Sequence, residues 1–120
     1  MSDLPAGEHA PRVLLWRTGA ISELGLRALC DELGVVVIPD HGGGSALDRI
    51  AAEHPRTVIV GVDAPGGGAA AAALAREAPQ VMVIAYSATG DQLQVFPRWG
   101  QGRSYRAPLT SERVTGLLSS

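Results

Sequence analysis

The stretch that most constrains the fold is residues 57–68, with the sequence TVIVGVDAPGGG. It opens with four consecutive β-branched residues, and an aspartate, a proline and four glycines follow within eight positions. A short apolar run that ends in turn residues is typical of a strand buried on both faces, as at the centre of a parallel sheet. An alanine-rich helical segment comes next, so the stretch predicts the strand-to-helix half of a βαβ unit. Ligands of open α/β sheets bind at the carboxyl ends of the strands, so residues 61–68 are expected to border the functional site.

Strand and helix patterns alternate along the rest of the chain. Apolar runs predict strands at residues 12–16, 35–38, 57–62 and 81–86, with a weaker fifth strand at 103–106. Helical spacing predicts helices at residues 19–34, 45–54 and 67–78, and a last helix capped by Thr110 or Ser111. Crossovers between parallel strands are right-handed. The pattern therefore predicts an α/β fold with a five-stranded parallel sheet, doubly wound into a three-layer α/β/α sandwich of the flavodoxin-like kind.

Residues 91–106 form the least regular part of the sequence. Residues 91–96 are interpreted as a short helix, which Pro97 ends because proline cannot donate the next helical hydrogen bond. Gly100 and Gly102 then prevent the helix from resuming.

Composition limits the class of protein. Residues 1–11 are expected to be a disordered lead-in, and residues 12–120 one domain, since 120 residues with 46% apolar content suffice for a core. No apolar run reaches the length of a membrane span and no secretory signal is present, so a cytoplasmic location is expected. A net charge of −2 gives no electrostatic basis for nucleic-acid binding. The single cysteine, Cys30, is expected to be a small buried hydrophobe.

Three segments, in this order, resemble the receiver domain of bacterial two-component response regulators. Residues 55–66, PRTVIVGVDAPG, resemble the family's central strand, in which an aspartate precedes a Pro-Gly pair. Residues 87–91, SATGD, resemble its switch serine or threonine segment, and residues 107–110, APLT, its Lys-Pro-Phe-Thr turn. The resemblance covers nearly the whole chain, and it implies a receiver-like domain in bacterial signalling or transcription regulation.

The resemblance also shows what this chain lacks. In the family a carboxylate accepts a phosphoryl group, acidic side chains hold Mg²⁺, and a lysine and a hydroxyl contact the phosphoryl oxygens. Here the acidic pair falls at Arg17 and Thr18, the acceptor at Gly61 and the lysine at Ala107, while only the hydroxyl, Ser87, is retained. All ten basic residues are arginine, so no shift of the alignment supplies a lysine.

Asp63 is the one acidic residue close to the aligned acceptor. It lies two residues beyond Gly61, and therefore on the same side by strand parity. It is interpreted as a turn aspartate bonded to local backbone, with a displaced phosphoacceptor as the alternative. The degenerate phosphorylation pocket is thus predicted to comprise Arg17, Thr18, Gly61, Asp63, Ser87 and Ala107.

Other candidate sites are weaker. His9, His41 and His54 share no ligand spacing with a cysteine or carboxylate, so neither a metal nor a cofactor is predicted. The glycine runs at residues 42–44 and 66–68 precede helix starts, where backbone N–H groups can hold an anion. Neither run matches a dinucleotide or phosphate-loop pattern, so they are interpreted as flexible turns, with anion binding as the alternative.

Arginines and aromatic residues gather near the end of the chain. This combination is enriched at interaction hot spots, so Trp99, Arg103, Tyr105 and Arg106 are predicted to form an interaction surface. The sequence therefore predicts a non-phosphorylatable pseudo-receiver that contacts another protein or a second copy of itself, and neither a membrane nor a nucleic acid. The alternatives are a small-molecule sensor that uses the vacated pocket and a small flavodoxin-like enzyme, although the sequence offers no nucleophile–base pair for catalysis.

Overall fold

The computed structural model describes residues 12–16, 20–38, 46–62, 67–87, 92–100, 103–108 and 110–119. The described elements, in chain order, are β1 (Arg12–Trp16), α2 (Ala20–Leu33), β2 (Val36–Ile38), α3 (Ala46–Glu53), β3 (Thr57–Gly61), α4 (Gly67–Glu77), β4 (Met82–Ser87), β5 (Gln92–Phe96), the 3₁₀ turn η1 (Arg98–Gly100), β6 (Tyr105–Pro108) and α5 (Ser111–Ser119). The predicted lead-in, residues 1–11, lies outside the described residues.

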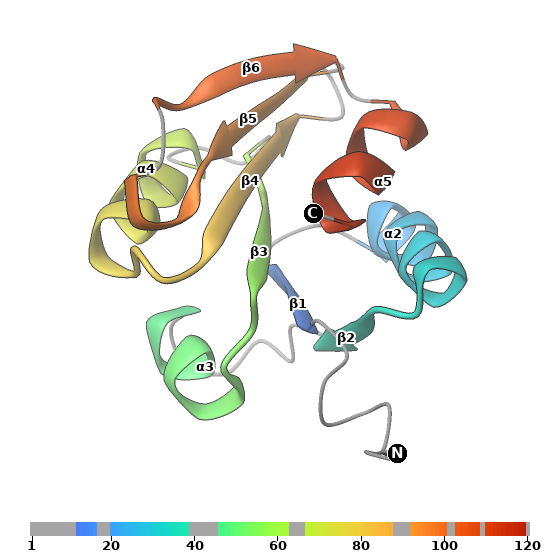
Figure 1. The fold of residues 1–120 in the computed structure, drawn as a ribbon, viewed down its shortest axis with the longest axis horizontal. Coiled ribbons are helices and arrows are strands. Elements are labelled where there is room, and N and C mark those ends of the chain that lie inside the picture. The colour runs from blue at the N-terminus through green and yellow to red at the C-terminus, as the bar shows by residue number, and fades with distance from the viewer. Residues whose placement is uncertain are drawn as a thin grey trace, which may run out of the picture.

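The strands form one mixed sheet in the order β2-β1-β3-β4-β5-β6 (Figure 1). Strands β1 to β4 are parallel to one another. Strand β5 is antiparallel to β4, and β6 is antiparallel to β5, so β6 forms one edge of the sheet and β2 the other.

Helices cover both faces of the sheet and create two apolar cores. On one face, α2 and α5 pack together, and their residues Cys30 and Leu117 lie in a core with Leu15 and Ile59 of the strands. On the other face, α3 and α4 cover a core that includes Val58 and Val60. Successive strand residues alternate between the two cores, as the period of a strand requires. Strand β3, buried over its whole length, is the centre of this three-layer sandwich.

The α/β class and the doubly wound arrangement are therefore confirmed, with one difference in the sheet. It has six described strands and is mixed, whereas five parallel strands were expected. The additional strand is β5, in residues that were interpreted as a short helix.

The physical reason lies in the alternation of polar and apolar side chains along β5. Leu93 and Val95 are buried in the core beneath α2 and α5, while Gln92 is exposed and Gln94 half-buried. An extended chain separates neighbouring residues in this way, and the resulting hairpin buries Leu93 and Val95 almost completely. The predicted strand at 103–106 accordingly begins later, at Tyr105.

The ends of two helices match their sequence signals. The backbone N–H of Arg113 donates to Thr110 Oγ1 at 3.1 Å, which identifies Thr110 as the N-cap of α5. Gly34 ends α2 with φ of 71°, and the N–H of Val35 donates to the carbonyl of Cys30 at 2.9 Å. None of the described helices is long and apolar enough to cross a membrane.

Candidate functional site

The carboxyl ends of the two central strands define the candidate site. Strand β3 ends at Gly61, which lies in register with Tyr86 of β4, and the N–H of Val62 donates to the Tyr86 carbonyl at 3.0 Å. Strand β4 ends one residue later, at Ser87. Gly61 is buried between these strands and carries no side chain, so the position predicted for the phosphoacceptor has no nucleophile.

Ala107, the position predicted for the lysine, is also unable to contribute. Its side chain is only 7% exposed and packs in the core beneath α2 and α5. Its strand, β6, is three positions away from β3, because β5 lies between β4 and β6. At about 4.8 Å per strand, the distance between β3 and β6 is roughly 14 Å. It would be roughly 10 Å if β6 paired directly with β4.

The remaining residues of the predicted phosphorylation pocket divide into two groups. Arg17, Thr18 and Asp63 lie outside the described residues. Ser87 is half-buried at the end of β4, opposite Gln92 of β5. The structure thus brings Gly61 and Ser87 to neighbouring strand ends and holds Ala107 away from both.

Ser87 opens into a small pocket of about 170 Å³ between the start of α4 and the β5–β6 hairpin. The polar residues in its described lining are Ser87, Gln92, Gln94 and Arg106, and Gly68 of α4 also lines it. Sequence reasoning missed both glutamines, although the alternation along residues 92–95 was the signal that would have placed them on one strand face.

The four residues predicted as one interaction surface do not share a face. Tyr105 and Arg106 are neighbours on β6, so their side chains point to opposite sides of the sheet. Trp99 lies in η1 at the opposite end of β5 from Ser87, where its backbone N–H donates to the Pro79 carbonyl at 2.6 Å. Its indole is 64% exposed, and Arg103 is exposed as well.

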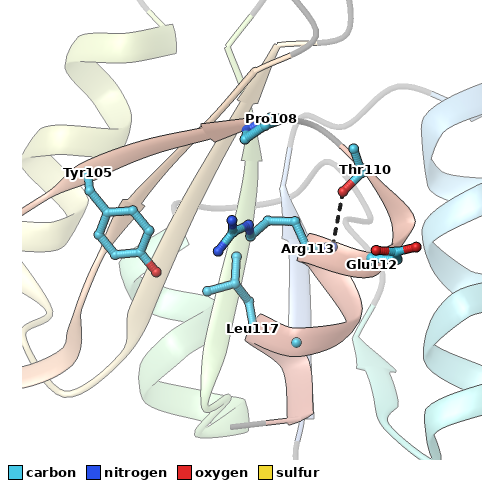
Figure 2. Close-up of a pocket in the computed structure, with 7 residues that line it drawn as sticks. Tyr105, Pro108, Thr110, Glu112, Arg113 and Leu117 are labelled. Atoms are coloured by element: carbon cyan, nitrogen blue, oxygen red, sulfur yellow. Dashed lines mark hydrogen bonds between the residues drawn. The ribbon is translucent and has the colours of Figure 1, made fainter.

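Tyr105 borders a second, larger depression of about 580 Å³ between the edge strand β6 and helix α5. Figure 2 shows Tyr105 of β6 and Arg113 and Leu117 of α5 projecting into the space between the strand and the helix. Pro108, Thr110, Glu112 and Gly116 complete its lining. We call this depression the β6–α5 groove.

The titratable groups of the described residues were compared for metal-binding clusters and for shifted pKa values. The described residues contain no group of three or more histidine, cysteine or acidic side chains able to hold a metal ion. Burial raises the pKa of the Cys30 thiol to about 11, and the negative charge of Asp31 adds to this effect. Cys30 lies in the core rather than at the strand ends, so it is not part of the candidate site.

Comparisons with known proteins define the fold class. A response regulator from Thermotoga maritima matches with a TM-score of 0.57 and 21% sequence identity, over 66% of this chain and 67% of that chain. No protein-family model and no curated protein sequence matches. The chain therefore has a receiver-like α/β fold, and the two strand ends at Gly61 and Ser87 are where this fold class would carry its site.

Proposed function

We propose that this chain is a receiver-like signalling module that works through protein contact and without phosphorylation. The observation that carries the proposal is Gly61, a buried residue without a side chain at the carboxyl end of the central strand. Nucleophilic capture of a phosphoryl group needs a carboxylate at this position, and glycine offers none. Ala107 supports the same proposal. It is buried and its strand lies three positions from β3, so a basic side chain at this position could not reach and stabilise the oxygens of a phosphoryl group at Gly61.

The β6–α5 groove is the contact surface that we propose. Strand β6 is an edge strand, so one row of its backbone groups has no neighbouring strand in the described sheet. Tyr105 is 42% exposed beside it, and exposed tyrosines in depressions are frequent anchors of protein contacts. A second copy of the chain fits this surface, because two β6 edges can pair about a two-fold axis and present the same residues to each other.

Trp99 supports a contact at the same hairpin. It adopts φ of 55°, a left-handed conformation that costs free energy for a residue other than glycine, and its ring remains 64% exposed. Burial of the indole therefore contributes little to the stability of the fold. A contact with another molecule would account for a large aromatic residue in this position.

The test of phosphorylation independence is intact mass after incubation with acetyl phosphate and Mg²⁺. We expect no added phosphoryl group on the wild-type chain. An added group that disappears in Asp63→Asn would assign the acceptor to Asp63 and contradict the proposal.

The test of the contact is sedimentation velocity over a range of protein concentrations. We expect Tyr105→Ala to weaken self-association by at least about thirtyfold, the usual consequence of removing an aromatic anchor worth about 2 kcal/mol. Trp99→Gly, which removes the ring and suits the left-handed backbone, is expected to weaken it as well. Val36→Ala is the matched control, because Val36 is 40% exposed on the opposite edge strand β2. Self-association that is absent in the wild type, or equal in Tyr105→Ala and Val36→Ala, would refute this surface.

A further inference from the structure

On one face of the sheet, the β5–β6 hairpin carries a strip of polar side chains next to Phe96, which packs against the core beneath α3 and α4. On the α4 side, strands β3 and β4 bury Val58, Val60 and Val83 against α3 and α4. Further across the same face, β5 and β6 present Gln92, Gln94 and Arg106 instead. The register places Gln94 directly between Ala85 of β4 and Arg106 of β6, so the polar groups form a contiguous strip.

This polar strip is hollowed rather than flat. The pocket described above lies over it, with a volume of about 170 Å³, on the order of five water molecules at about 30 Å³ each. A solvated hairpin face would need polar residues but no concavity. The pocket also has an apolar floor at Val62 and Ala85, so it offers both contact area and hydrogen-bonding groups, as small-ligand sites do.

Among the described residues that line the pocket, the charged side chain is an arginine. Arg106 is the charged residue among its described lining, which otherwise contributes a hydroxyl, two amides and apolar groups. Within the described residues, no carboxylate lies within ion-pair distance of the Arg106 guanidinium. An arginine with free donors can bind an oxyanion through two parallel hydrogen bonds, and the Ser87 hydroxyl and the glutamine amides can donate to the same group.

We propose that this pocket binds a small metabolite through its oxyanion, a phosphate or a carboxylate group, which the Arg106 guanidinium contacts directly. The site is separate from the β6–α5 groove, because Tyr105 and Arg106 point to opposite faces of β6. It does not rest on the proposed protein contact. A ligand here touches the ends of β4 and α4 and the hairpin together, since Ser87, Gly68 and Gln94 line one pocket.

The test is an NMR titration of the ¹⁵N-labelled chain with inorganic phosphate and, separately, with acetate, each against sodium chloride of equal ionic strength. We expect saturable shifts of the Gly68 and Ser87 amides and of the Gln94 side-chain amide. Saturation by phosphate alone assigns a phosphate-bearing ligand, and saturation by acetate alone assigns a carboxylate. Both results support the pocket.

Two variants of equal charge make the test specific. Arg106→Gln is expected to weaken binding at least about tenfold, because it removes a charge-assisted pair of hydrogen bonds. Arg103→Gln removes an exposed arginine three residues away that does not line the pocket, and it should bind as the wild type does. Ser87→Ala should weaken binding by a smaller factor. The proposal is overturned if neither anion shifts these resonances, or if Arg106→Gln and Arg103→Gln have the same effect.

Discussion

Cys30 is fully buried in the core between α2 and the sheet, and this position controls its reactivity. The thiolate is the reactive form, and a pKa near 11 leaves almost none of it at neutral pH. We therefore expect iodoacetamide to label the native chain far more slowly than the chain unfolded in urea, as measured by intact mass. Equal labelling rates in the two states would show that the thiol is accessible.

The same pKa predicts how stability changes at alkaline pH. The folded-state value of about 11 lies above the ordinary value of 9.0, so the neutral thiol is favoured by folding. Its contribution is fully present below about pH 9 and is lost as the pH rises through about 11. Urea unfolding at a series of pH values should show this fall in the wild type, and Cys30→Ala, which has nothing to titrate there, should show a smaller one.

Tyr105 and Arg106 were predicted to share one interaction surface, and the structure places them on opposite faces of β6. They were grouped because they are adjacent in sequence, yet adjacency on a strand separates two side chains onto opposite faces. The residue types indicated side chains suited to protein contacts. To decide which of them share a face, however, one must know where β6 begins and ends. That extent depends on its pairing with β5, which the sequence interpretation had treated as helix.

Gly25 lies in helix α2 and Gly34 directly follows it, and the two glycines should respond oppositely to the same substitution. Gly25 lies inside the helix, and a methyl group added there would meet no atom within 4 Å. Gly25→Ala is expected to stabilise the chain by about 0.5–1 kcal/mol, because glycine costs the helix backbone entropy. Gly34 has φ of 71°, so Gly34→Ala should destabilise the chain by about 1 kcal/mol despite equally open space.

Thermal unfolding measures both effects. A change of 1 kcal/mol moves the midpoint of a domain of this size by roughly 3–6 °C, so the two variants should lie on either side of the wild type. If both substitutions shift the midpoint in the same direction, the end of α2 at Gly34 is wrongly assigned.

At the level of elements, strong local sequence signals were sufficient to predict most of the helices and strands of the sandwich. The β-branched run at residues 57–60 and the alanine-rich run after Gly68 fixed β3 and α4 within a residue or two. Residues 92–96 were missed, because Pro97 and two glycines suggested an interrupted helix while the alternation of Gln92 to Val95 was overlooked. A five-residue amphipathic strand has a weak signal of its own, and it is stabilised here by pairing with β4 on one side and β6 on the other.

For the whole molecule, the order of strands decides which residues can meet. The lack of a nucleophilic side chain at Gly61 could be predicted from the sequence, because the Pro-Gly pair at residues 65 and 66 aligns Gly61 with the phosphoacceptor position of receiver domains. The distance of Ala107 from Gly61 could not be predicted from the sequence, because it follows from the position of β5 between β4 and β6. The small pocket at Ser87 was equally unpredictable, because it requires α4, β4 and the hairpin to be placed together.

The position of β5 between β4 and β6 leads to a prediction about substitutions at Gly61 and Ala107. Gly61→Asp and Ala107→Lys together supply a carboxylate and a lysine, but not the acidic pair that falls at Arg17 and Thr18, and we expect no phosphorylation by acetyl phosphate and Mg²⁺. The lysine would begin three strands from β3, and its side chain would point into the apolar core beneath α2 and α5. Ala107→Lys alone should therefore lower the free energy of unfolding by roughly 2 kcal/mol or more, because it buries a charge among apolar groups.

Arg106→Lys is the matched control for this stability effect. It places a lysine one position earlier on the same strand, where the side chain faces the opposite side of the sheet and is exposed, so its urea midpoint should stay close to that of the wild type. Intact mass would detect a phosphoryl group on the Gly61→Asp, Ala107→Lys chain, with Asp63→Asn included to remove the neighbouring carboxylate. A phosphorylated product in that background, or an Ala107→Lys variant as stable as Arg106→Lys, would contradict the placement of β6 three strands from β3 with Ala107 facing the apolar core.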